Sequence, residues 1–169
     1  MDYFQLFNIP VALKIDKAGL AKQYFELQKK YHPDFFAQAG KEEQDDVLEI
    51  SSAVNKAFKI FQNADETIKY VLLQKGLLQE EEKYILPPGF LMDMMDLNEQ
   101  LMDAKLEGDK AKIADISGQL SSRQNEIYAP VKEIIENYND SISTEKELLQ
   151  VKEYYYKKKY LNRILAGLN

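Results

Sequence analysis

The chain has 169 residues, of which 45% are hydrophobic and 30% are charged, so it has enough apolar material for one folded domain or two small ones. This composition excludes a disordered chain, and the length excludes a large multidomain enzyme. The 22 lysines and arginines against 28 acidic residues give a net charge of −6, which argues against nonspecific binding to nucleic acid because that binding depends on cationic contacts with phosphates.

The lack of cysteine removes several kinds of chemistry at once. Without a thiol, the chain has no disulfide, no thiolate nucleophile and no cysteine ligands for zinc or an iron-sulfur cluster. The single histidine, His32, excludes a site with several histidine ligands. We therefore predict no cofactor and no metal.

The first seven residues read Met-Asp-Tyr-Phe-Gln-Leu-Phe. They contain neither a basic stretch nor an apolar run of the length that a signal peptide or a membrane span requires. We expect a cytoplasmic protein that does not bind membranes.

An all-α fold is predicted from the helical spacing of apolar residues in every long segment. The clearest break is Leu86-Pro87-Pro88-Gly89, because two successive prolines remove two amide donors and disfavour helix before them. We predict a first domain over residues 1–76, a connector over 77–88 and a second domain over 89–169.

The first domain is predicted to be a helical hairpin with short flanking helices. A short helix covers 3–7, and a second begins after the N-cap Asp16 and must end before Pro33. A third helix lies between 47 and 61, and a fourth runs from 66 to about 75 and ends at Gly76. The apolar stripes of the two longer helices are Leu20, Tyr24, Leu27 and Tyr31, and Val47, Ile50, Val54, Ala57 and Phe61. Helices with matched stripes joined by a loop form an antiparallel pair.

The second domain is predicted to be an antiparallel three-helix bundle. Its first helix runs from about 89 to 107 and ends at Gly108, and its last begins with the capping-box pair Thr144 and Glu147. Pro130 interrupts the middle helix, so we expect a kink or break near Tyr128. The predicted core residues are Ile113, Ile116, Leu120, Ile127, Val131, Ile134 and Tyr138 in the middle helix, and Leu148, Val151, Tyr155, Leu161, Leu165 and Leu168 in the last. Of the three consecutive tyrosines at 154–156, we expect only Tyr155 to pack in the core.

The sequence His32-Pro33-Asp34 stands at the predicted tip of the hairpin. One reading is structural, with Pro33 ending the helix, Asp34 making a turn and His32 lying on the surface. However, the surrounding helices, the opening 2–7 and the segment Asn55-Lys56-Ala57-Phe58 together resemble the J-domain, which activates ATPases of the DnaK-type chaperone class. The resemblance implies that His32, Pro33 and Asp34 contact the chaperone, with Asp34 pairing with an arginine of the partner. It also implies a protein that is not an enzyme and has no catalytic residues of its own.

The helix before this motif is basic. Its segment 17–30 holds four lysines and one acid, and Lys22, Lys29 and Lys30 lie on one side. Such a row is often only a solvated helix face. J-domains use a basic face here against an acidic chaperone surface, so the resemblance implies that these three lysines bind the chaperone. Phe35 departs from the pattern, because a basic residue commonly follows the motif in this family.

The first helix of the second domain carries more apolar residues than one core stripe needs. Its core stripe is Phe90, Met94, Leu97, Leu101 and Ala104. Leu91, Met92, Met95 and Met102 are left over, beside an acidic row of Asp96, Glu99 and Asp103. The methionines could fill an irregular core, but the separate stripe and its acidic edge favour a partner site. Segment 90–107 has five acids and one lysine, hence −4, so the expected partner surface is basic.

A J-domain followed by a three-helix bundle that opens with Phe-Leu-Met resembles the HscB family of co-chaperones for iron-sulfur cluster assembly. The resemblance covers nearly the whole chain. It implies two protein partners, a DnaK/HscA-type chaperone and an iron-sulfur scaffold protein of the IscU type. By position, the scaffold-binding residues would be Leu91, Met92, Met95, Asp96, Glu99 and Asp103, with Tyr160 from the last helix. The cysteine-rich extension of eukaryotic relatives is missing, which indicates the bacterial form.

Two alternatives remain open at this point. The bundle could recognise a different or broader protein client while the hairpin still serves a chaperone. A hydrolase that uses Asp96 and Glu99 as paired carboxylates is disfavoured, because the acids lie on periodic, solvated helix faces that would not raise a carboxyl pKa.

Overall fold

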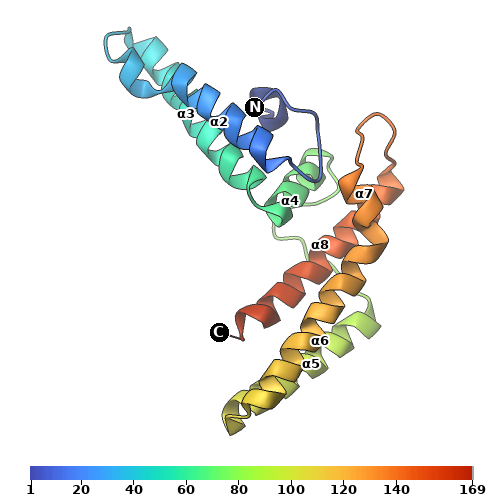
Figure 1. Ribbon diagram of the computed structural model, residues 1–169. Helices are drawn as coiled ribbons and strands as arrows, with labels where there is room; N and C mark the ends of the chain where they lie inside the picture. Colours follow the sequence, from blue (N-terminus) through green and yellow to red (C-terminus); the bar gives the residue numbers. More distant parts are fainter. Residues whose placement is uncertain (169) are drawn as a thin grey trace. The chain divides into compact units, whose positions relative to one another are not determined.

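The computed structural model describes residues 1–168, and these residues form helices, turns and loops without a strand (Figure 1). The prediction of an all-α fold is therefore confirmed. Two compact units are present: Met1–Gln74 with Tyr138–Ile142 form the first, and Lys75–Asn137 with the chain from Ser143 form the second. The last position of the domain predicted over 89–169 lies outside the described residues.

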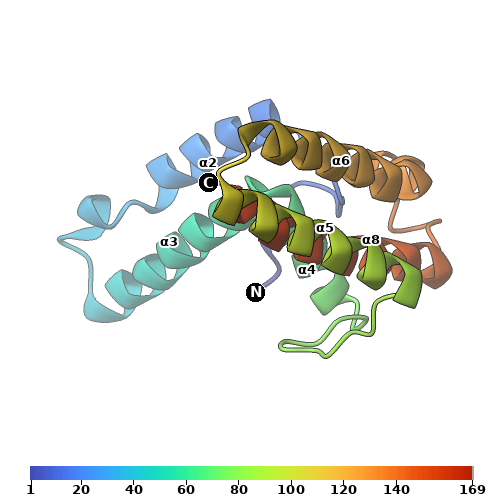
Figure 2. The same cartoon turned by 90° about the horizontal axis from the view of Figure 1, so that it is seen from below.

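The first unit is built on a helical hairpin. Its elements are α1 (Tyr3–Leu6), α2 (Lys17–Tyr31), the 3-10 turn η1 (Pro33–Phe36), α3 (Lys41–Phe61) and α4 (Ala64–Gln74). Helices α2 and α3 lie side by side and are joined by the segment that contains η1 (Figures 1 and 2). The η1 turn was not predicted, because four residues are too few to show an apolar period.

Local capping fixes where these helices begin and end. The carboxylate of Asp16 accepts hydrogen bonds from the amides of Ala18 (3.3 Å) and Gly19 (3.1 Å), as its position in the sequence predicts. At the other end of α2, His32 is extended (φ −68°, ψ 126°), the conformation that a residue before proline prefers.

Aromatic residues hold the open end of the hairpin. Phe4 and Phe7 of the N-terminal segment are fully buried against Phe61 of α3, with ring centroids 4.8 and 5.7 Å apart. Farther along the hairpin, Tyr24 stacks on Phe58 at 3.8 Å, so α2 and α3 are braced over several turns. The rigid pair presents its connecting segment at the far end.

The second unit contains the predicted bundle. Its elements are α5 (Pro88–Glu107), α6 (Lys110–Tyr128), the 3-10 turn η2 (Ala129–Val131), α7 (Lys132–Glu136) and α8 (Glu145–Ala166). Helices α5, α6 and α8 pack on one another and run alongside in both views (Figures 1 and 2). The buried residues of the cluster at their centre are Met94, Leu97, Leu101, Ala104, Ile116, Leu120, Leu161 and Ile164.

The signals for helix ends in this unit were correct. Gly108 follows α5 with a left-handed φ of 69°, and Thr144 with Glu147 forms a complete capping box at α8. The middle helix breaks after Tyr128, where Pro130 lies in η2.

Four predicted core residues of the middle helix are half-buried rather than fully buried: Ile113, Ile127, Ile134 and Tyr138. Ile135 is buried rather than Ile134, because the 3-10 turn at η2 shifts the register of the residues that follow. Ile164 and Tyr154 of α8 are buried, whereas Leu165 and, just after the helix, Leu168 are only half-buried. The prediction that Tyr155 alone of its three neighbours packs in the core was therefore wrong, since Tyr154 shares the face of Leu161 and lies 5.7 Å from the ring of Tyr128.

The segment before α5 is fixed to the second unit. Glu82 accepts hydrogen bonds from Lys152 Nζ (2.9 Å) and from the Tyr156 hydroxyl (3.0 Å), and Tyr84 stacks on Tyr156 with ring centroids 4.5 Å apart. Among residues 1–168, no helix combines the length and apolar character that crossing a membrane requires.

Candidate binding surfaces

His32-Pro33-Asp34 lies at the tip of the hairpin and faces solvent. The side chains of His32 and Asp34 are 46% and 86% exposed. His32 Nδ1 accepts a hydrogen bond from the amide of Asp34 (3.3 Å), so the neutral imidazole carries its proton on Nε2. The tip thus offers one ring donor and one carboxylate on a backbone that Pro33 restricts.

Gln44 of α3 clamps the segment that follows the motif. Its Nε2 donates to the carbonyl oxygens of Phe36 (3.2 Å), Ala37 (3.1 Å) and Ala39 (3.0 Å). Two amide protons serve three acceptors, so one proton is shared. Sequence reasoning missed Gln44, because a glutamine on an exposed helix face gives no periodic signal.

The three predicted lysines lie on the exposed surface of α2. Lys29 and Lys30 occupy its last turn, directly before His32, and Lys22 is two turns earlier. Lys29 Nζ lies 4.5 Å from the ring centroid of Phe25, which is itself exposed. The basic face and the motif therefore form one continuous stretch of chain.

The leftover residues of α5 lie largely on the surface. Met92, Met95 and Met102 are 70%, 55% and 58% exposed, whereas Met94 and Leu97 of the core stripe are buried. Leu91 is half-buried. Counting stripes in the sequence thus separated core methionine from surface methionine correctly.

A groove of about 780 Å³ runs over this face of the second unit. It is lined by Met92, Asp93, Met95, Asp96, Asn98, Glu99, Met102 and Tyr160. The structure brings five of the predicted scaffold-binding residues together here, including Tyr160 from α8. It does not place the half-buried Leu91 or the exposed Asp103 in the groove.

The groove also contains residues that the sequence-based site left out. Asp93, Asn98 and Met102 line it, and Asn98 Nδ2 lies 3.9 Å from Met102 Sδ. Met102 belonged to the leftover stripe, so its signal was present in the sequence. Asn98 gave none, because a single polar residue beside a core stripe is ordinary.

Tyr160 and the exposed acids Asp96 and Glu99 contribute to the polar character of the groove. Tyr160 is half-buried against the bundle core, and the guanidinium of Arg163 lies 5.7 Å from its ring. Asp96 and Glu99 are exposed, and Gln100 donates to Asp96 Oδ2 (3.2 Å). An apolar floor with an acidic rim fits a partner that combines apolar and basic side chains.

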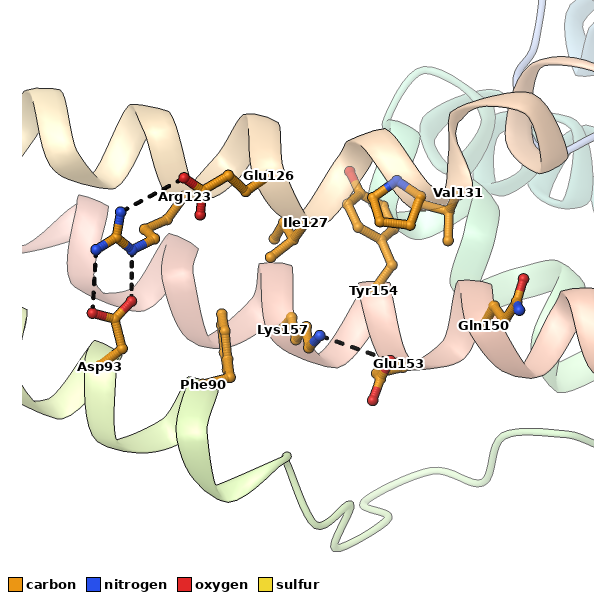
Figure 3. A pocket seen from close by; sticks show the side chains of 11 residues that line it. Phe90, Asp93, Arg123, Glu126, Ile127, Val131, Gln150, Glu153, Tyr154 and Lys157 are labelled. Atoms are coloured by element: carbon orange, nitrogen blue, oxygen red, sulfur yellow. Dashed lines mark hydrogen bonds and ion pairs between the residues drawn. The ribbon is translucent and has the colours of Figure 1, made fainter.

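A second hollow, of about 420 Å³, lies between α5, α6 and α8, and its charges pair with one another (Figure 3). Arg123 Nε donates to Asp93 Oδ2 (2.6 Å) and its Nη2 to Oδ1 (3.3 Å), which raises the pKa of the arginine. Lys157 pairs with Glu153 (3.7 Å). The pair of Arg123 and Asp93 joins α6 to α5, whereas the pair of Lys157 and Glu153 lies within α8, so we assign the hollow a structural role. Residues 1–168 contain no cluster of three or more histidine, aspartate or glutamate side chains that could hold a metal ion.

The family profile described as HSCB C-terminal oligomerisation domain matches residues 86–169. A co-chaperone protein HscB homolog of Colwellia psychrerythraea is 32% identical over 93% of this chain and 91% of its own length. The co-chaperone protein HscB of Proteus mirabilis is 34% identical over 71% and 70%. The chain belongs to the HscB family of co-chaperones.

Solved HscB structures share its fold. Human co-chaperone HscB superimposes with a TM-score of 0.80 at 27% identity, covering 99% of this chain and 80% of the human one. Chaperone HscB of Vibrio cholerae gives a TM-score of 0.75 at 23% identity, covering 99% and 95%. Both the hairpin and the bundle of this HscB-family chain therefore have the fold seen in solved HscB structures.

Proposed function

We propose that this HscB-family chain stimulates the ATPase of a DnaK/HscA-type chaperone through His32-Pro33-Asp34 and delivers an iron-sulfur scaffold protein of the IscU type to it through the α5 groove. The observation that carries the proposal is that each compact unit exposes one surface of its own. The first unit presents the motif beside a basic helix, and the second presents exposed methionines beside acids.

The surface of the first unit that is proposed to bind the chaperone suits rapid and specific docking. The tip is already ordered, because Pro33 restricts its backbone and Gln44 clamps the following carbonyls, so little conformational entropy is lost on binding. Lys22, Lys29 and Lys30 would steer an acidic surface toward the tip, and Asp34 would make a charge-assisted bond to an arginine of the partner. ATP hydrolysis takes place in the chaperone, whose conformational equilibrium shifts because one state binds the tip better.

The groove proposed to bind the scaffold suits an adaptable apolar contact with a partner whose contact surface is surrounded by basic side chains. The unbranched, polarizable thioethers of Met92 and Met95 can fit an irregular partner surface. Asp96 and Glu99 at the edge would select basic side chains and set the orientation. Leu91 and Asp103 would contact the partner beyond the groove itself.

The test is the substitution His32→Gln in the full chain. We expect stimulation of chaperone ATP hydrolysis to be abolished, because the glutamine cannot reproduce the ring donor and its geometry, while scaffold binding is unchanged. A melting temperature equal to that of wild type would show that the variant is folded. Loss of both activities in a folded variant would contradict the assignment of two separate surfaces.

A second candidate keeps the chaperone surface and gives the bundle a broader client range. The three exposed methionines favour it, because flexible thioether surfaces accommodate several partners. Competition by unrelated unfolded proteins for the groove would support this function. The acidic edge favours a defined basic partner instead, so we expect such competitors to be weak.

A further inference from the structure

Phe35 follows the motif and is 71% exposed, although phenylalanine is among the residues most often buried. Its ring lies edge-on to that of His32, with centroids 5.9 Å apart. The next residue, Phe36, is half-buried. Two adjacent phenylalanines therefore point to different environments, and the one that faces solvent occupies the position where J-domains commonly carry a basic residue.

The loop geometry keeps Phe35 on the surface. Its amide donates to the carbonyl of His32 (3.0 Å), and the carbonyls just beyond it are bound by Gln44. These bonds fix the backbone on both sides of Phe35, and with it the direction in which the side chain leaves the chain. The ring is thus presented on the surface of the tip, with its edge toward His32.

A second exposed aromatic residue lies on the basic face. Phe25 is 58% exposed and stands between Lys22 and Lys29, at the i−3 and i+4 spacings that put residues on one helix face. The ammonium of Lys29 lies 4.5 Å from its ring. The surface that adjoins the motif is therefore a basic face that also carries apolar rings.

We infer that Phe35 is an apolar anchor for the ATPase domain of the DnaK/HscA-type chaperone, with Phe25 as a weaker second contact. The inference rests on the proposed function. Phe35 directly follows the motif proposed to dock there, and the lysines of α2, which ends just before the motif, fit the same acidic partner surface. The matching chaperone surface would present an apolar spot opposite Phe35, where a chaperone suited to a cation at this position would present an acid. Phe35 is thus a specificity determinant.

The experiment titrates the full chain into a purified HscA-type chaperone of the same organism and measures steady-state ATP hydrolysis. For Phe35→Ala we expect the half-stimulating concentration to rise about tenfold with maximal stimulation retained, as for loss of one buried aromatic contact. Phe35→Leu should stay within about threefold of wild type, because it keeps most of the apolar area. Phe35→Lys should be at least as weak as Phe35→Ala. A tighter response for the lysine variant, or an unchanged response for alanine, would overturn the inference.

Salt and matched controls separate this inference from the proposed function. The ratio of the half-stimulating concentrations of Phe35→Ala and wild type should be the same at low and high salt. The effect of Lys29→Gln on that concentration should shrink at high salt, because salt screens the charge of the lysine. Ile85→Ala removes a still more exposed apolar side chain from the second unit and should have no effect. If the wild type fails to stimulate, or His32→Gln stimulates normally, the proposed function itself fails. If wild type and His32→Gln behave as expected but all Phe35 variants have the half-stimulating concentration of wild type, the role of Phe35 as an anchor is refuted and the proposed function stands.

Discussion

Glu82 is a single carboxylate that ties the segment before α5 to α8. Its bonds to Lys152 and Tyr156 hold its pKa below the usual value, with the lysine as the larger cause. A carboxyl whose pKa is lowered by folding stabilises the folded state above its unfolded pKa of about 4.5, and this contribution is lost as the pH falls through the folded pKa.

The prediction concerns Glu82→Gln. At pH 7 the free energy of unfolding should fall by about 0.5–1.5 kcal/mol, because a partly buried charged hydrogen bond is removed. At a pH below the lowered folded-state pKa the wild-type carboxyl is protonated, so the difference between variant and wild type should narrow there. Urea titrations at both pH values measure it, and an equal difference at both would contradict the role of the charge.

The pair Asp93 and Arg123 makes a similar prediction for the bundle itself. Both side chains are about one-third exposed, so solvent screening weakens the pair. In a double-mutant cycle with Asp93→Asn and Arg123→Met, we expect a coupling free energy of about 0.5–1.5 kcal/mol from urea unfolding. A coupling near zero would show that the bidentate geometry contributes no stability.

At the scale of elements, the sequence signals were strongest at helix ends. A capping residue acts within one helical turn, so the helix end that it predicts does not depend on the rest of the fold. This holds for Asp16, Gly108 and the pair Thr144 and Glu147. The errors arose where a continuous helical period was assumed. Pro130 was recognised as a break, but the 3-10 turn around it shifts the register, and this shift is set by how α7 packs against α8.

Two glycines provide the element-scale prediction. Gly108 ends α5 with φ 69°, so Gly108→Ala should destabilise the chain by about 1 kcal/mol. Gly118 lies inside α6 with open space around it, so Gly118→Ala should stabilise by about 0.5–1 kcal/mol through helix propensity. Thermal or urea unfolding of both variants checks this, and changes of the same sign would contradict the assignment of α5's C-terminal cap.

The candidate site was predictable to the extent that it follows one helix. Met92, Met95, Asp96 and Glu99 could be selected from α5 alone, since a core stripe and a leftover stripe differ in phase. The presence of Tyr160 in the groove depends on how α8 packs against α5, and it was suggested only by resemblance. Gln44 could not be found in this way, because its contacts with the loop exist only in three dimensions.

At the scale of the whole molecule, the proposed function requires two surfaces that act independently. One belongs to the hairpin unit and the other to the bundle unit, and no residue is shared by the two. Changes in one surface should therefore leave binding at the other unaltered, because effects at sites that share no residue and no partner are additive. This independence is what delivery of one protein to another requires.

The measurement that tests this claim most directly is calorimetric titration of an IscU-type scaffold with three forms of the chain: wild type, the triple variant Leu91→Ala, Met92→Ala and Met95→Ala, and Leu106→Ala. Leu106 is exposed on the same helix outside the groove, so its variant is the matched control. We predict that the triple variant weakens scaffold binding by about 1–3 kcal/mol, that the control binds as wild type, and that both still stimulate the chaperone ATPase. An unchanged dissociation constant for the triple variant, or loss of ATPase stimulation along with scaffold binding, would contradict the account.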